Sequence, residues 1–117
     1  MSRDKEMPSD HSNLEVTLMR EILAVLLEQK QWKKSRVIAD WLVLRGDVAA
    51  SIVKVEVMLR MHDNLAALES LVILPISVRK VVRVRQLEAR IIHEFGYQEL
   101  AKQVYLSSLN PHYFNGL

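Results

Sequence analysis

Residues that commonly carry out chemistry are few in this chain, and they are widely spaced. The 117 residues include four histidines and no cysteine. The chain contains no glycine-rich phosphate loop, no activated nucleophile pattern and no pair of carboxylates isolated in an apolar context. The histidines are too scattered to form a metal site by their spacing; they are His11, His62, His93 and His112. We therefore expect no enzymatic activity, no metal site and no cofactor.

A run of basic residues between positions 79 and 90 is the strongest charged feature. Glu88 and Glu94 interrupt the positive charge, and no recognisable DNA- or RNA-binding motif accompanies it. The net charge of +2 is too small to determine a partner. A solvated helix face explains the run better than a contact with nucleic acid. Its cations are Arg79, Lys80, Arg83, Arg85 and Arg90.

The composition favours helices that pack through aliphatic side chains. Hydrophobic residues make up 50% of the chain but aromatic residues only 6%, and three glycines and three prolines are too few for a turn-rich β-sandwich. The absence of cysteine fits a reducing compartment. The polar first residues lack the apolar core of a signal peptide, and the longest apolar stretch, Leu71 to Val78, is too short to span a bilayer. We expect a cytoplasmic protein without membrane insertion.

Apolar periodicity and helix-capping residues predict one helical domain over residues 13–109. Residues 1–12 lack apolar side chains apart from Met1 and Met7, so they are expected to be a flexible N-terminal arm. Ser12 then stands three residues before Glu15, which is the spacing of a capping box. Asn110-Pro111 is expected to close the last helix and leave residues 110–117 as a C-terminal tail. The expected helices span residues 13–29, 33–45, 48–61, 64–74, 78–95 and 97–109.

The segment from Val81 to Arg85 is the place where a strand competes with a helix. It is β-branched and partly alternating, which taken alone suits a strand. The window around it, from Val78 to Phe95, has mainly helical spacing. We therefore interpret the segment as part of a helix.

The helices show an internal period that predicts an all-α, right-handed stack of three degenerate tetratricopeptide-like helix pairs. Trp32, Leu65 and Tyr97 each follow a polar turn and begin the second helix of a pair, at separations of 33 and 32 residues. Tetratricopeptide repeats have a period of about 34 residues. In this alignment nine positions of the first helices are apolar, and we expect them in the core: Met19, Ile22, Leu26, Ile52, Val55, Leu59, Val84, Leu87 and Ile91.

The first helices of such a stack line its concave side, because each repeat contacts only its neighbours. The alignment places mainly aliphatic residues there, with Arg20, Arg60 and Arg85 near the edges, where they are expected to orient a guest. A contiguous apolar surface usually marks a binding site, and an aliphatic groove with a flexible Met suits the apolar face of an amphipathic helix. The alternative is a compact stack in which these residues are core. The predicted groove consists of Ala24, Leu27, Val53, Val57, Arg60, Met61, Val82, Arg85, Ala89 and Ile92.

Residues 36–46 resemble a stretch of the bacterial type III secretion needle chaperones of the YscG/PscG kind. Here the stretch reads Arg-Val-Ile-Ala-Asp-Trp-Leu-Val-Leu-Arg-Gly. The family has Ile-Ala, an acidic residue and Trp-Leu, followed after one residue by Leu, a basic residue and Gly. The likeness continues less tightly through His62 to Leu68, and after Pro75 it is one of pattern rather than of residues.

The resemblance implies a fold, a function and two partners. Members of that family are cytosolic, tetratricopeptide-like helical stacks that hold the C-terminal amphipathic helix of the needle subunit and prevent its premature polymerisation. A small helical co-chaperone of the YscE/PscE kind binds and stabilises them. The longer polar N-terminal arm and the basic fifth helix depart from the family pattern, and they leave open which surface meets the co-chaperone.

Two other functions stay open at this point. The chain is alternatively a general tetratricopeptide-like adaptor or homo-oligomerisation domain outside secretion, in which the apolar face pairs with another copy. A weaker hypothesis is a nucleic-acid-binding regulator that uses the basic fifth helix, in which case binding falls steeply with added salt.

Overall fold

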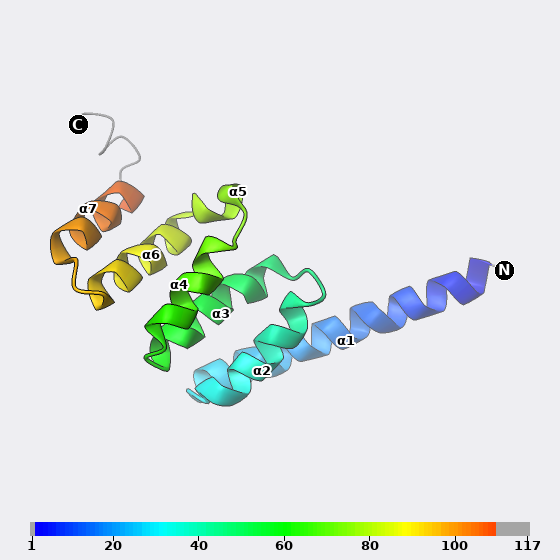
Figure 1. Cartoon of the computed structure of the whole chain (residues 1–117). Helices are drawn as coiled ribbons and strands as arrows, with labels where there is room; N and C mark the ends of the chain where they lie inside the picture. The colour runs from blue at the N-terminus through cyan, green and yellow to red at the C-terminus, as the bar shows by residue number, and fades with distance from the viewer. Residues whose placement is uncertain (1, 110–117) are drawn as a thin grey trace.

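The structure, a computed structural model, describes the backbone of residues 2–109 and the side chains of residues 13–109. This part of the chain is all-α, as the sequence predicts, and contains no strand (Figure 1). The expected tail over residues 110–117 lies outside it. The helices are α1 Ser2–Glu28, α2 Trp32–Val43, α3 Val48–Arg60, α4 Asn64–Val72, α5 Ile76–Arg79, α6 Val82–Glu94 and α7 Gln98–Leu109.

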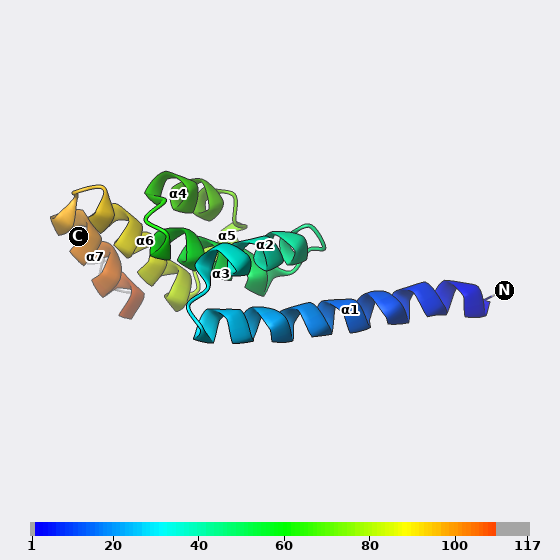
Figure 2. The ribbon, with the colours of Figure 1, turned by 90° about the horizontal axis from the view of Figure 1, so that it is seen from below.

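The six longer helices form three pairs that stack along the chain. Helix α1 packs on α2, α3 on α4 and α6 on α7. Neighbouring pairs are joined because α3 also packs on α2, and α6 packs on α3 and α4. Figure 2 shows α1 along one side of the stack and α4 on the opposite side. The predicted stack of helix pairs is confirmed.

The helix expected over residues 78–95 is two helices in the structure. Helix α5 follows Pro75 and ends at Arg79, and α6 begins after Val81, whose backbone is extended with φ −65° and ψ 137°. An extended backbone is usual for the residue that precedes the first turn of a helix. Only Val81 is extended, and it belongs to no strand, because Val82 to Arg85 are helical as expected.

Helix α1 begins at Ser2 instead of near residue 13. The expectation of an arm over residues 1–12 rested on their lack of apolar side chains. That property governs burial and says little about backbone conformation, since Asp, Lys, Glu and Met are all tolerated in helices.

Aliphatic side chains form the core in two clusters. The cluster around α1 and α2 contains Leu23, Ala39 and Leu42. The cluster of the second and third pairs includes five of the nine expected core residues, namely Val55, Leu59, Val84, Leu87 and Ile91. In contrast, Ile22 of α1 is 37% exposed, because no helix pair of the described chain packs on the outer side of α1.

A left-handed residue follows α1, α2, α3 and α6, with φ values of 56° at Lys30, 81° at Gly46, 60° at His62 and 95° at Gly96. In each turn the next N–H donates to a carbonyl in the last turn of the helix; for example, the distance from Gln31 N to Leu26 O is 2.9 Å. This is the hydrogen-bond pattern of the Schellman motif, which satisfies carbonyls that the helix end leaves free.

The positions of the left-handed residues show how the three repeats align residue by residue. The second helix of each pair begins two residues after Lys30, His62 or Gly96, which places its start at Trp32, Asn64 and Gln98. The alignment based on Leu65 and Tyr97 is therefore wrong by one residue in each later repeat, and in opposite directions. One residue rotates a helix face by about 100°, so this difference changes which side chains face the groove.

Substitutions at the left-handed positions test this turn geometry. We expect Gly96→Ala to lower the free energy of unfolding by about 1 kcal/mol and Lys30→Gly to raise it by up to about 1 kcal/mol, because only glycine adopts positive φ without a steric cost. No neighbouring atom lies within 4 Å of a Cβ at residue 96, so the cost is that of the backbone alone.

Urea unfolding followed by circular dichroism measures both effects. The control is Lys34→Gly in α2, where glycine is expected to destabilise by about 1 kcal/mol. If Lys30→Gly loses as much stability as the control, residue 30 does not have the left-handed backbone described here.

Candidate partner-binding groove

The predicted groove residues of α3 and α6 are partly misplaced. Val57 is 0% exposed and Ala89 is 5% exposed, so both belong to the interior rather than to an open surface. Counted back from the observed starts of the second helices, the counterparts of Ala24 are Glu56 and Arg90. The predicted aliphatic face therefore holds for α1 but is charged at these two positions in the later repeats.

An apolar hollow of about 200 Å³ lies between α1 and α3. It brings together the predicted residues Ala24, Leu27 and Val53. Ala24 is exposed, and Leu27 and Val53 are half-buried, so their side chains remain available at the surface. Leu42 of α2 also lines the hollow and is fully buried. The complete lining of this apolar hollow is Arg20, Leu23, Ala24, Leu27, Leu42, Asp47, Ala49, Ala50 and Val53.

A second, more polar hollow of about 560 Å³ adjoins the first, because Leu27 lines both. The predicted residue Arg60 lies in it, with its guanidinium 5.8 Å from the centre of the Trp32 ring. The sequence alignment did not place Lys30, Glu56 or Arg90 in the groove. The left-handed turns at His62 and Gly96 correct the alignment of the later repeats. We call this the basic hollow, and its lining is Leu27, Lys30, Trp32, Glu56, Leu59, Arg60, His62 and Arg90.

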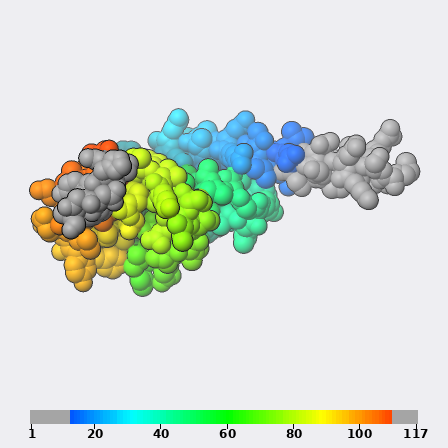
Figure 3. All heavy atoms as spheres, turned by 90° about the horizontal axis from the view of Figure 1, so that it is seen from above, coloured from blue at the N-terminus to red at the C-terminus, as the bar shows by residue number. Residues whose placement is uncertain are grey.

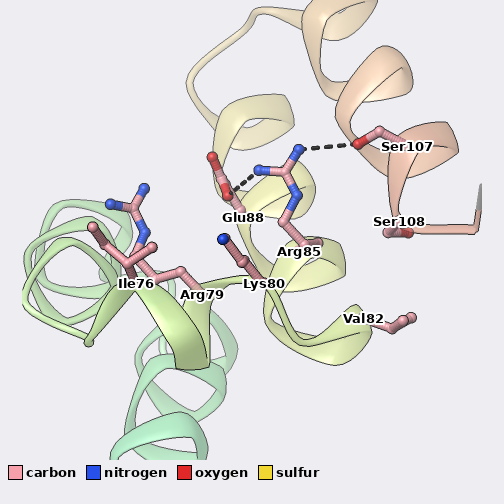
Figure 4. A pocket seen from close by; sticks show the side chains of 8 residues that line it. All are labelled: Ile76, Arg79, Lys80, Val82, Arg85, Glu88, Ser107 and Ser108. Atoms are coloured by element: carbon pink, nitrogen blue, oxygen red, sulfur yellow. Dashed lines mark hydrogen bonds and ion pairs between the residues drawn. The ribbon is translucent and has the colours of Figure 1, made fainter. Parts of the chain in front are cut away.

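Val82 and Arg85 of the predicted groove lie in a third hollow of about 410 Å³, where α5, α6 and α7 meet. Figure 4 shows Arg85 reaching toward Ser107, while Val82 points away from them. The guanidinium of Arg85 donates to Glu88 at 2.9 Å and to Ser107 at 3.0 Å. Neither Val82 nor Arg85 lines the apolar or the basic hollow.

The two remaining predicted residues, Met61 and Ile92, are half-buried and line none of these three hollows.

Most of the expected orienting arginines are already engaged within the chain. Arg20 donates to the Asp47 carboxylate at 2.7 Å, and Arg85 is bound as described above. In the basic run, Arg83 pairs with Glu56 across α6 and α3. Of the three arginines predicted to orient a guest, only Arg60 lacks an ion pair with a described residue.

Asp47 joins α1 to α3 at the edge of the apolar hollow. Its carboxylate caps α3 by accepting from the Ala50 N–H at 3.0 Å. Burial raises the pKa of Asp47, but the hydrogen bond and charge of Arg20 and the N–H groups of Ala49 and Ala50 outweigh burial and hold the pKa below its ordinary value of 3.8. The side chain is 5% exposed, so the pair is shielded on its acidic side.

The outer face of α1 carries a row of exposed aliphatic side chains, which we call the α1 stripe. The spacing of three and four residues places them on one face of the helix. Figure 3 shows α1 along one edge of the molecule. The stripe consists of Leu14, Leu18, Ile22 and Val25, which are 68%, 55%, 37% and 50% exposed.

No protein-family model, curated protein or solved structure matches the chain. Among the residues that the structure describes, no helix is long and apolar enough to cross a membrane. In the same part of the chain, no three histidine or acidic side chains are grouped as metal ligands would be. The described chain thus presents two adjoining hollows and an exposed aliphatic stripe on α1.

The ion pair of Asp47 predicts a pH-dependent contribution to stability. Because the pKa of Asp47 is lower in the folded chain than in the unfolded chain, its charge stabilises the fold at pH values above about 4. This contribution is lost as the pH falls through the folded-state pKa. Asp47→Asn keeps a capping oxygen but removes the charge, so we expect it to cost about 1–2 kcal/mol at pH 7 and progressively less below pH 4.

Urea unfolding of both proteins between pH 7 and pH 2 measures the difference in the free energy of unfolding. Arg20→Gln is the matched control, since it removes the same pair from the other side. If the difference in the free energy of unfolding between wild type and Asp47→Asn stays constant over this range, the charge of Asp47 does not stabilise the fold.

Proposed function

We propose that the chain is a chaperone that binds an amphipathic helix of another protein across α1 and α3. The observation that carries this proposal is the apolar hollow lined by Ala24, Leu27 and Val53, on a surface that no described segment covers. An apolar cavity of about 150 Å³ accommodates a benzene ring. A hollow of about 200 Å³ therefore has room for one large apolar side chain of a guest.

The energetics favour a guest with several anchors. Burial of one Leu-sized side chain contributes roughly 1.5–3 kcal/mol, which alone does not offset the entropy that a partner loses on binding. A helix that places one side chain in the apolar hollow and another along Leu27, which lines both hollows, gains more contact. Amphipathic helices present such anchors at intervals of three and four residues.

The resemblance of residues 36–46 supports a specific partner, namely the C-terminal helix of a type III secretion needle subunit. In the structure this stretch lies in α2 and the turn after it. Ala39 and Leu42 are fully buried, and Leu42 lines the apolar hollow. The Arg45 guanidinium lies 3.4 Å from the centre of the Trp41 ring. We propose that the chain acts in the bacterial cytosol by masking the stripe through which needle subunits polymerise.

The α1 stripe supports a second partner, the small helical co-chaperone that the resemblance implies. End repeats of helical stacks usually carry a polar outer face. The outer face of α1 is instead aliphatic, and exposed apolar surface of this kind commonly marks an interface. The same stripe also favours the alternative function, in which two copies of a general adaptor associate through α1.

Filling the apolar hollow is expected to abolish guest binding without unfolding the chain. Ala24→Trp places an indole in the hollow from an exposed helical position. We expect the dissociation constant for the needle subunit to rise at least about a hundredfold, which corresponds to the loss of roughly 3 kcal/mol. Co-expression, co-purification and light scattering of the needle subunit measure the effect.

The matched control is Val37→Trp, because Val37 is exposed on α2 and lines none of the hollows. It is expected to bind as wild type does. If Ala24→Trp folds and still keeps the needle subunit monomeric, the proposed groove is wrong.

A charge placed on the α1 stripe tests whether the stripe binds the co-chaperone or a second copy of the chain. We expect Leu18→Glu to prevent binding of the co-chaperone and to leave binding in the apolar hollow unchanged, because an unpaired charge resists desolvation. Sedimentation of the isolated wild-type chain identifies the alternative: a stable homodimer that Leu18→Glu converts to a monomer favours self-association. Leu65→Glu, at an exposed position of α4, is the control.

A further inference from the structure

The basic hollow holds three cations with no acidic partner. Lys30 lies in the turn after α1, Arg60 at the end of α3 and Arg90 within α6. None of them forms an ion pair with a described residue. The carboxylate in the lining, Glu56, is already paired with Arg83. The surface next to the apolar hollow therefore carries an uncompensated positive charge.

Helix ends account for part of this charge but not for all of it. Lys30 and Arg60 lie beside the C-terminal ends of α1 and α3, where a cation offsets the partial negative charge of the last carbonyls. The turn hydrogen bonds already satisfy several of those carbonyls, including Leu26 O and Met58 O. Arg90 lies a full turn before the end of α6, so capping does not explain its place in the hollow.

We propose that the basic hollow binds acidic side chains at one end of the guest helix and thereby sets the direction in which the helix lies. The inference rests on the proposed function and adds the charge and the orientation of the guest. Its apolar anchors lie against Ala24, Leu27 and Val53. Its acidic end lies against Lys30, Arg60 and Arg90, beside the turns that follow α1 and α3.

The geometry supports this division of the groove. Leu27 lines both hollows, so one helix passes from the apolar to the basic part without leaving the surface. The Arg60 guanidinium lies 5.8 Å from the centre of the Trp32 ring, within the range of a cation–π contact. Arginine binds carboxylates through a planar pair of donors, which makes the contact sensitive to orientation.

Three designed 20-residue amphipathic peptides test the inference. They share one apolar stripe and differ only at one end, where they carry two Glu, two Gln or two Lys. By isothermal titration calorimetry at low salt, we expect the Glu peptide to bind about tenfold more tightly than the Gln peptide, and the Lys peptide to bind most weakly. The advantage of the Glu peptide is expected to shrink as salt is added.

The double variant Lys30→Gln/Arg90→Gln removes two of the cations and leaves Arg60 and Trp32 unchanged. We expect it to bind the Glu and Gln peptides with about equal affinity. Lys33→Gln/Lys34→Gln is the matched control, since it removes the same charge from exposed positions of α2 outside the hollow. Circular dichroism verifies that both variants fold.

Tryptophan fluorescence tests the direction. The chain has two tryptophans, so Trp41→Phe leaves Trp32 as the reporter in the basic hollow. A quencher on the acidic end of the Glu peptide is expected to reduce Trp32 fluorescence strongly, and a quencher on the opposite end weakly. Equal quenching from both ends overturns the proposed orientation.

The remaining outcomes separate this inference from the proposed function. Equal binding of all three peptides to wild type overturns the inference and leaves the apolar groove in place. Binding of none of them overturns both. A short single-stranded DNA that displaces the Glu peptide, and that loses affinity in the double variant, shows that the cations contact phosphates and also overturns the inference.

Discussion

The left-handed residue in each tight turn between helices is the constraint on which the rest of the structure depends. It ends one helix, reverses the chain and fixes the rotation at which the next helix begins. Because the turns at Lys30, His62 and Gly96 share this geometry, the three pairs stack as repeats of one unit. The position of each turn therefore decides which side chains enter the core and which face the groove.

The repeat architecture follows from the sequence because it depends on averages over many residues. Apolar spacing at Val55, Leu59, Leu87 and Ile91 predicts buried helix faces, and all four side chains are buried. The caps also act locally: Asp47 accepts from the N–H of Ala50, as its place before a helix suggests. The break after α5 was missed because Val81 and its neighbours tolerate either an extended or a helical backbone.

The residues of the groove were less predictable, because the face that a helix exposes depends on the exact alignment of the repeats. Ala24, Leu27 and Val53 come together as expected, but an error of one residue exchanges Glu56 for Val57 and Arg90 for Ala89. Gly46 and Gly96 indicate left-handed turns in the sequence. Lys30 and His62 adopt the same backbone, but their residue types do not indicate it. The ion pair of Arg20 with Asp47 and the hydrogen bond of Arg85 to Ser107 join side chains 27 and 22 residues apart, which helical periodicity does not reveal.

The way α1 is attached determines what a guest in the groove would add to the structure. Helix α1 packs mainly on α2, and it reaches the second pair through the ion pair of Arg20 with Asp47 and through the edge of the apolar cluster at Ala50 and Val53. The proposed guest between α1 and α3 would contact two pairs that are joined to each other mainly where α2 packs on α3. Such a guest would add a second connection between α1 and α3, beside the ion pair of Arg20 with Asp47.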